Sequence, residues 1–241
     1  MFGIIGGVGP RATVAFYSTL IDLVASRSSG HLPRLLIYSV GMTADIENSF
    51  LAGNVSECAP ARVQARGLLE EAVTYFLRNE VETVVMPCNT LQDELAALCK
   101  NRPIDHINMI DETAKAILEA NCQRLFVLGT SSICRDDLYG RRLRPHQITC
   151  VYPQAAEQQF IERYIRQALD QKLDAALKER FAQVVKAGAQ GCDGILIACT
   201  DLSGDLAPAD CCLPVFDSLQ LLASASARHI LTQKTLFAVA D

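Results

Sequence analysis

The sequence predicts an α/β fold with mainly parallel sheets. Short apolar runs alternate with longer segments of helical periodicity along the whole chain, which is the pattern of strands connected by helices. Several of the runs are apolar at every position, as expected for parallel strands that helices cover on both faces. The chain has 241 residues, of which 50% are hydrophobic and 20% charged, so it is long enough for one or two domains with a substantial core.

Eight apolar runs predict the strands. The first turns at Gly6 and Gly7 and has no basic residue before it, so we interpret it as a buried strand and not as a signal peptide. None of the runs approaches the ~20 residues that a membrane-spanning helix needs. The strands are predicted at residues 3–5, 35–40, 83–86, 107–110, 125–128, 148–151, 194–198 and 213–216.

Segments with helical periodicity lie between these runs. The first begins near Pro10, and its spacing predicts one buried stripe. That stripe comprises Val14, Tyr17, Leu20, Ile21 and Val24. The remaining helices are predicted at residues 59–78, 92–99, 112–120, 155–187 and 218–231, with a break near Asp170.

Charge and cysteine content limit the partners and the compartment. A net charge of −5 provides no basic surface for nucleic acid. The ten cysteines are not needed as disulfides in a chain of this length without an export signal, so they indicate a reducing, cytoplasmic location. Most of them are interpreted as small hydrophobic side chains. These are Cys58, Cys99, Cys122, Cys134, Cys150, Cys192, Cys211 and Cys212.

The other two cysteines occur in a repeated pattern. Residues 84–90 and 195–201 each consist of an apolar strand, then Cys88 or Cys199, then a hydroxyl or amide side chain, and a possible helix start follows each. The two patterns are about one domain length apart. They predict two similar α/β halves, each with a cysteine at the carboxyl end of a strand.

Such a position suits acid–base chemistry. Ligands of open α/β sheets bind at the carboxyl ends of strands. Free N–H groups at a helix start stabilise a thiolate, so we expect a lowered thiol pKa there. Asn89, Thr90 and Thr200 can donate to a carboxylate. Two cysteines on opposite sides of a cleft could therefore move a proton between the two faces of a substrate α-carbon. The simpler interpretation is two buried cysteines beside ordinary capping residues.

Six short motifs follow one another along the chain. They are Gly-Ile-Ile-Gly-Gly-Val-Gly-Pro at 3–10, Met-Pro-Cys-Asn-Thr at 86–90, Met-Ile-Asp-Glu-Thr at 109–113, Leu-Gly-Thr-Ser at 128–131, Ala-Cys-Thr-Asp-Leu-Ser at 198–203 and Pro-Val-Phe-Asp at 214–217. In this order they resemble the cofactor-independent aspartate/glutamate racemase family, over nearly the whole chain.

The resemblance implies two pseudo-symmetric α/β domains with the active site in the cleft between them. Residues 1–110 with 215–241 would form one domain, and residues 111–214 the other. It also implies a homodimer that acts on an amino acid without pyridoxal phosphate or a metal, with Cys88 and Cys199 as the acid/base pair. The substrate-binding residues would be Asn89, Thr90, Thr130, Ser131, Thr200, Gly7 and Val8.

Departures from the family pattern concern the substrate. Thr90 is followed by Leu91 and Gln92 where the family often has histidine nearby, and Asp201 replaces the usual glutamate. Residues 41–46 lack the arginine that aspartate-specific members tend to have. Leu169 stands at the position of their lysine, with Lys172 close to it in the sequence. The reaction is therefore better predicted than the substrate: aspartate, glutamate, or a longer or less acidic amino acid.

Other functions are less compatible with the sequence. Gly7, Gly9 and Ala12 match a dinucleotide-binding fingerprint, but the first acidic residue after the second strand is Asp45, which is not at the strand end where a ribose ligand is needed. A zinc site lacks ligand spacing among the cysteines and histidines. A decarboxylase of the same superfamily, which needs only one of the two thiols, and a non-catalytic amino-acid binding protein both remain alternatives.

Overall fold

The computed structural model describes residues 1–43, 46, 55–206, 212–233 and 237, without the side chains of residues 55–59. It contains two four-stranded parallel sheets. The first comprises β1 (Phe2–Gly6), β2 (Leu35–Ser39), β3 (Thr83–Val85) and β4 (Asp105–His106). The second comprises β5 (Arg124–Leu128), β6 (Thr149–Val151), β7 (Gly194–Ile197) and β8 (Val215–Asp217).

The two sheets have the same topology. The strand orders are β2-β1-β3-β4 and β6-β5-β7-β8, so each strand of the first sheet has an equivalent in the second. In particular, β3 and β7 occupy equivalent places. The predicted fold class, α/β with mainly parallel sheets in two similar halves, is confirmed.

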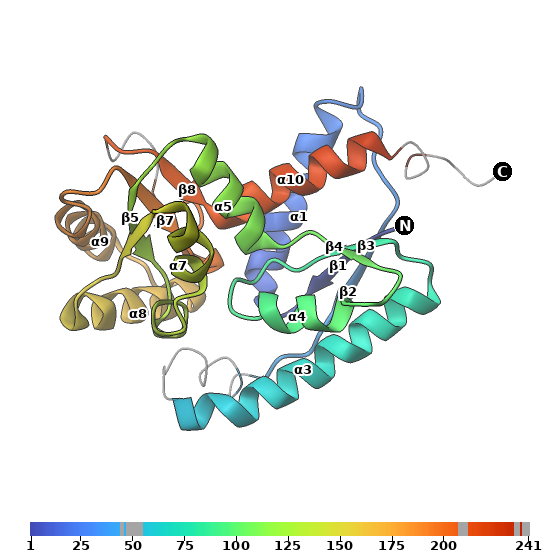
Figure 1. Cartoon of the computed structure of the whole chain (residues 1–241), viewed down its shortest axis with the longest axis horizontal. Coiled ribbons are helices and arrows are strands. Elements are labelled where there is room, and N and C mark those ends of the chain that lie inside the picture. Colours follow the sequence, from blue (N-terminus) through green and yellow to red (C-terminus); the bar gives the residue numbers. More distant parts are fainter. Residues whose placement is uncertain (44–45, 47–54, 207–211, 234–236, 238–241) are drawn as a thin grey trace.

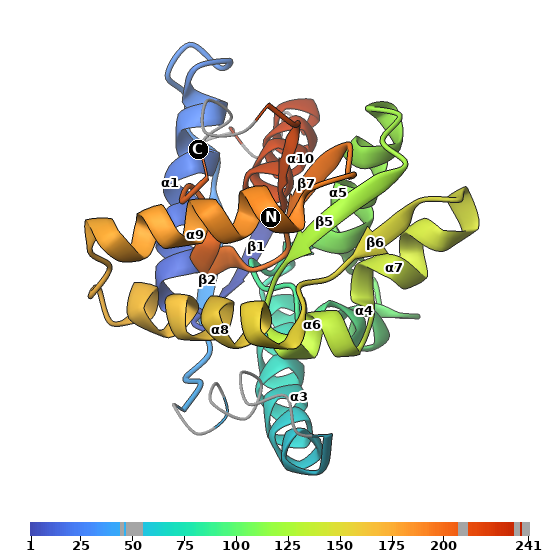
Figure 2. The same cartoon turned by 90° about the vertical axis from the view of Figure 1, so that its left-hand side faces the viewer.

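Helices cover both faces of each sheet (Figures 1 and 2). The longer helices are α1 (Pro10–Ala25), α3 (Val55–Arg78), α4 (Gln92–Cys99), α5 (Met109–Glu119), α8 (Ala155–Leu169), α9 (Ala175–Gly188) and α10 (Ser218–Thr232). The short ones are α6 (Ser131–Arg135), α7 (Leu138–Leu143) and the 3-10 turns η1 (Arg144–His146) and η2 (Thr200–Leu202). Within the described ranges, no helix combines the length and apolar character needed to cross a membrane.

Separate apolar clusters fill the space between each sheet and its helices. One face of the first sheet packs against α3, and the other packs against α1 and α10 through Phe2, Ile4, Phe16 and Leu222. The second sheet is covered by α8 and α9 on one face and by α5 and α7 on the other. Burial of this apolar surface is the main force that orders both halves.

The C-terminal segment connects the two halves. We expected residues 215–241 to complete the first domain, but Val215–Asp217 form β8, which pairs with β7 in the second sheet. Only α10 then returns to pack against α1 (Figure 1). The predicted boundary before Val215 is therefore wrong. A short strand contributes its hydrogen bonds to whichever sheet has a free edge beside it, and the sequence does not reveal which sheet that is.

Two local predictions are also corrected. The strand predicted at residues 107–110 is instead β4 at Asp105–His106, and α5 begins at Met109 because the Asn108 side chain accepts hydrogen bonds from the N–H groups of Ile110 and Asp111. The stripe predicted for the first helix is only partly buried. Val14 is 70% and Tyr17 40% exposed, while Ala12 and Phe16 are buried beside Leu20 and Val24.

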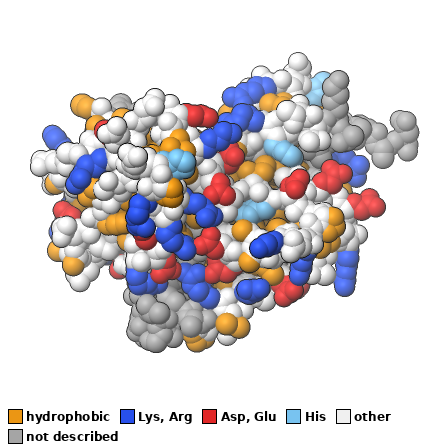
Figure 3. Space-filling view, in the orientation of Figure 1, with side chains coloured by type: hydrophobic (Ala, Val, Ile, Leu, Met, Phe, Trp, Pro, Cys, Tyr) orange, Lys and Arg blue, Asp and Glu red, His pale blue; other side chains and the backbone are white. Residues whose placement is uncertain are grey.

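Ion pairs link the two halves on the side of α4 and α7. Arg141 of α7 pairs with Asp93 of α4 at 2.9 Å, and Arg62 of α3 contacts both Glu94 and Asp136. Figure 3 shows positive and negative side chains interspersed over this face, without a patch of one sign. The ion pairs help to fix the orientation of one half relative to the other.

Candidate functional site

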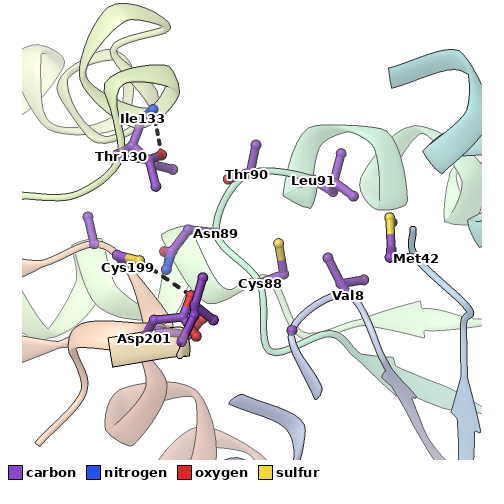
Figure 4. A pocket seen from close by; sticks show the side chains of 14 residues that line it. Val8, Met42, Cys88, Asn89, Thr90, Leu91, Thr130, Ile133, Cys199 and Asp201 are labelled. Carbon is purple, nitrogen blue, oxygen red and sulfur yellow. Dashed lines mark hydrogen bonds between the residues drawn. The ribbon is translucent and has the colours of Figure 1, made fainter. Parts of the chain in front are cut away.

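A pocket lies between the two halves, at the carboxyl ends of the strands (Figure 4). Its volume is about 90 Å³. The segments after β1, β2 and β3 contribute one wall. The segments after β5 and β7, together with the last residue of α8, contribute the other. The lining residues are Val8, Gly9, Met42, Cys88, Asn89, Thr90, Leu91, Thr130, Ile133, Leu169, Ala198, Cys199, Thr200 and Asp201.

Cys88 follows β3 and is half-buried at the pocket. Burial raises the pKa of its thiol to about 11, while the backbone N–H groups of Leu91 and Thr90 oppose this rise by hydrogen bonding to the sulfur. The N–H groups that we expected are present at the sulfur, but the predicted lowering of the thiol pKa is wrong, because burial outweighs these hydrogen bonds.

Gln92 fixes the loop that carries Cys88. Its side-chain nitrogen donates to the carbonyl oxygens of Met86 (2.9 Å) and Cys88 (2.6 Å), and its side-chain oxygen accepts from the N–H of Met109 (3.0 Å). Gln92 is fully buried. Because its three hydrogen bonds join β3, the cysteine loop and α5, Gln92 is a structural residue that the sequence reasoning missed.

Cys199 follows β7, at the place equivalent to Cys88, and is 7% exposed. Its thiol donates a hydrogen bond to the Asp201 carboxylate, with Sγ and Oδ2 3.8 Å apart. Burial raises the pKa of Cys199 well above its ordinary value, and the negative charge of Asp201 raises it further. A negative charge on Cys88 also raises the pKa of Cys199, so the ionisation of one thiol disfavours the ionisation of the other. This environment favours the protonated form of Cys199.

Asn89 is almost completely buried and connects three parts of the chain. Its amide oxygen accepts from the Tyr139 hydroxyl, and its amide nitrogen donates to Ser218 Oγ at 3.0 Å. One amide N–H is left for a ligand, because an amide nitrogen has two hydrogens. Thr90 and Thr200 are half-buried and line the same pocket.

Thr130 and Val8 also line the pocket, but Ser131 and Gly7 are not among its lining residues. The Ser131 N–H donates to Glu162 (3.2 Å), and the Gly7 N–H donates to Thr13 Oγ1 (3.0 Å). Gly7 has a φ of +83°, and a Cβ there would lie 2.2 Å from the Val40 carbonyl oxygen. Gly7 thus forms the turn, and the next two residues, Val8 and Gly9, face the pocket.

Apart from Val8, the apolar lining was not identified from the sequence. Ile133 comes from α6, a helix too short to show periodicity, and Ala198 ends the run that contains β7. Met42 and Leu169 lie where the sequence departs from the family pattern, and in the structure both line the pocket. Asp201 was noted only as a shorter carboxylate, yet it contacts Cys199.

The remaining cysteines whose side chains are described lie elsewhere. All are free thiols, and most are buried or half-buried, but Cys212 is exposed, so the hydrophobic interpretation does not apply to it. Asp45, Cys211 and the side chain of Cys58 lie outside what the structure describes. Among the described residues, no group of three His, Cys, Asp or Glu side chains converges as metal ligands do.

Fold and site together define a class: an α/β protein of two similar halves, with a small-molecule pocket between them and one cysteine from each half on its wall. The family model described as Asp/Glu/Hydantoin racemase matches residues 5–226. The chain therefore belongs to this racemase family.

Individual relatives agree with this membership. The broad-specificity amino-acid racemase RacX of Bacillus subtilis (strain 168) is 24% identical over 233 residues, which cover 94% of this chain and 96% of RacX. A Yersinia pestis structure described as a candidate Asp/Glu racemase is 25% identical with a TM-score of 0.80, covering 95% and 98% of the two chains. Picrophilus torridus aspartate racemase has the same fold, at 22% identity and a TM-score of 0.72, over 95% and 93%.

Proposed function

We propose that this protein is a cofactor-independent amino-acid racemase in which Cys88 and Cys199 exchange protons with the two faces of the substrate α-carbon. The observation that carries the proposal is that these two cysteines follow equivalent strands, β3 and β7, and line one pocket. A pair of opposed thiols is what two-sided proton transfer requires, since each face needs its own acid or base.

The reaction begins with Cys88 as thiolate and Cys199 as thiol. Cys88 removes the α-proton, so that a C–H bond breaks and an S–H bond forms. The Cys199 thiol then gives its proton to the opposite face of the carbanion, which leaves the configuration inverted and Cys199 ionised. The opposite enantiomer reacts by the reverse sequence, so no external oxidant, reductant or co-reactant is consumed.

The polar groups around the cysteines would stabilise the carbanion. Its charge spreads onto the substrate carboxylate, where Asn89, Thr90 and Thr200 can donate hydrogen bonds, with Thr130 nearby on the lining. We expect Asp201, which contacts Cys199, to accept a hydrogen bond from the substrate ammonium group. Ser131 and Gly7 would act indirectly, by holding the loops that carry Thr130 and Val8. The predicted homodimer and cytoplasmic location remain predictions.

Two alternatives use the same pocket. A decarboxylase of the same superfamily needs one of the two thiols, and the presence of both on the lining favours racemisation. A protein that only binds an amino acid would need neither thiol. Deuterium exchange at the α-carbon of an amino acid that keeps its carboxylate distinguishes these alternatives. A decarboxylase would lose CO₂ as it takes up a solvent proton, and a binding protein would exchange nothing.

The experiment is NMR detection of Cα deuteration in D₂O, across a panel of L- and D-amino acids, for the wild type and three variants. Cys88→Ser and Cys199→Ser should each lose racemisation by about 10²–10⁴-fold, the usual contribution of an acid or base. Cys192→Ser replaces a half-buried thiol outside the pocket lining and should leave the rate unchanged. Full racemisation by either active-site variant would contradict the proposal, as would a wild type that exchanges no amino acid.

A further inference from the structure

The pocket wall divides into a polar part and an apolar part. The polar groups, Asn89, Thr90, Thr130, Thr200 and Asp201, lie in the segments that follow β3, β5 and β7, as do the two cysteines. The rest of the lining is hydrocarbon or thioether. It consists of Val8, Met42, Leu91, Ile133, Leu169 and Ala198, apart from the backbone of Gly9.

Part of this apolar wall forms one continuous surface. Val8, Met42 and Cys88 pack against the core cluster that contains Leu91. In Figure 4, Val8, Met42 and Leu91 lie beyond Cys88, on the side away from Cys199 and Asp201. Leu169 packs against the cluster that contains Cys199, so it supplies apolar surface from the other half.

The chemistry of the reaction fixes which part of a substrate meets each wall. The α-carbon must contact both sulfurs, so its carboxylate and ammonium groups fall among the polar residues. Asp201 lies 3.8 Å from the Cys199 sulfur and is therefore within reach of groups on the α-carbon, not of the far end of a side chain. The substrate side chain is left with the apolar surface.

The charges near the pocket disfavour an ionised side chain. Neither lysine nor arginine is among the described lining residues, and residues 44–54 contain neither in their sequence. Arg11 lines an adjoining cavity together with Asp201. Burial raises the pKa of the Asp201 carboxyl group, and the Cys199 hydrogen bond and the charge of Arg11 oppose this rise. The Arg11 charge is thus already opposed by a carboxylate. A buried substrate carboxylate without a counterion is strongly disfavoured.

From this we infer that the substrate is an amino acid with an uncharged, apolar side chain, such as leucine or methionine, and not aspartate or glutamate. The inference rests on the proposed function for the position of the α-carbon between Cys88 and Cys199. This substrate class differs from the one that the family name indicates, because the described residues of the pocket wall include no cation that could pair with a second carboxylate.

The test is calorimetric binding to the wild-type protein, since binding does not depend on turnover. Racemic leucine, methionine, aspartate, glutamate and lysine are compared, because racemisation leaves the composition of a racemic ligand unchanged. Leucine or methionine should bind at least about tenfold more tightly than each charged amino acid. Tighter binding of aspartate, glutamate or lysine would overturn the inference, and so would the failure of both apolar amino acids to bind.

A charge placed in the apolar wall provides a second test. Met42→Arg should shift the preference between leucine and aspartate by at least about tenfold toward aspartate. The matched control is Leu32→Arg, the same kind of change at a side chain that is 54% exposed and not on the pocket lining, and it should leave the preference unchanged. An unaltered preference in a folded Met42→Arg protein would count against the inference.

The same samples separate this inference from the proposed function. Deuterium exchange at the α-carbon reports proton transfer, whereas the ranking of affinities reports the side-chain preference. Tight apolar binding without exchange would support the substrate class and reject the racemase. Deuterium exchange with aspartate as the preferred substrate would support the racemase and reject the apolar substrate class.

Discussion

The Tyr139 hydroxyl donates a hydrogen bond to the amide oxygen of Asn89, and so joins α7 of the second half to the residue that follows Cys88 in the first. The Asn89 amide nitrogen donates in turn to Ser218 at the start of α10. All three residues are buried. One hydrogen-bonded chain therefore sets the position of the Cys88 loop relative to the half that carries Cys199.

Tyr139→Phe should destabilise the protein by about 1–3 kcal/mol, because it leaves the Asn89 amide oxygen buried without a donor. Racemisation should also slow, since the Cys88 loop loses a constraint from the opposite half. Chemical denaturation gives the free energy of unfolding. Tyr17→Phe, at a tyrosine that is 40% exposed, is the matched control and should change stability by less than about 0.5 kcal/mol. Equal effects of the two changes would show that the hydrogen bond contributes little.

Asp201→Asn should make Cys199 more reactive. Burial is the first cause of the raised pKa of Cys199, and the Asp201 charge is the second. Removing that charge lowers the pKa, so a larger fraction of Cys199 is thiolate at pH 8.5 and alkylation accelerates by up to about tenfold for each unit of pKa. Iodoacetamide labelling followed by peptide mass spectrometry measures each cysteine separately. Asp22→Asn, an exposed carboxylate on α1, should have no effect; slower labelling in Asp201→Asn would contradict this account.

The rate of racemisation should rise with pH. The pKa of Cys88 is raised to about 11, so over neutral and mildly alkaline pH only a small fraction is thiolate, and that fraction grows about tenfold per pH unit. We expect kcat/KM to follow this slope between about pH 7 and pH 9. Initial rates of deuterium exchange at constant ionic strength test it, and a flat profile would indicate a different base.

Folded-state stability limits that measurement at high pH. The pKa of Cys88 and of Cys99 is about 11 in the folded protein and 9.0 for an ordinary thiol. The unfolded chain therefore loses these protons first, and stability that is fully present below pH 9 is lost as the pH rises toward 11. The rates are compared only where thermal unfolding shows the protein intact.

Gly7→Ala should be severely destabilising, by more than about 3 kcal/mol, because the new Cβ would lie 2.2 Å from the Val40 carbonyl oxygen. Gly30→Ala is a matched control. Gly30 has a similar φ of +85° but no atom within 4 Å of its Cβ position, so only backbone strain of about 1–2 kcal/mol is expected. Thermal denaturation distinguishes the two, and similar losses would mean that the φ value and not the close contact decides.

Local sequence signals predicted the sheets well because a strand covered by helices must be apolar on both faces. They failed where a single side chain or the packing of a helix decides which residues are helical or buried. Asn108 caps α5 and converts Met109 and Ile110 from apparent strand into helix. In the first helix, Val14 and Tyr17 have the right spacing but lie on an exposed face, because the position of α1 on the sheet selects Ala12 and Phe16.

By itself, the sequence determined the fold class and the repeated strand–cysteine pattern, on which the proposed roles of Cys88 and Cys199 depend. These features rest on residue types that are close together along the chain. The tertiary structure alone decided what surrounds the two sulfurs. Met42, Leu91, Ile133 and Leu169 belong to four different segments, and only the packing of the two halves brings them to one pocket. The preference for one kind of substrate side chain depends on this combined wall. Its polarity and charge arise from contacts between residues that are far apart in the chain.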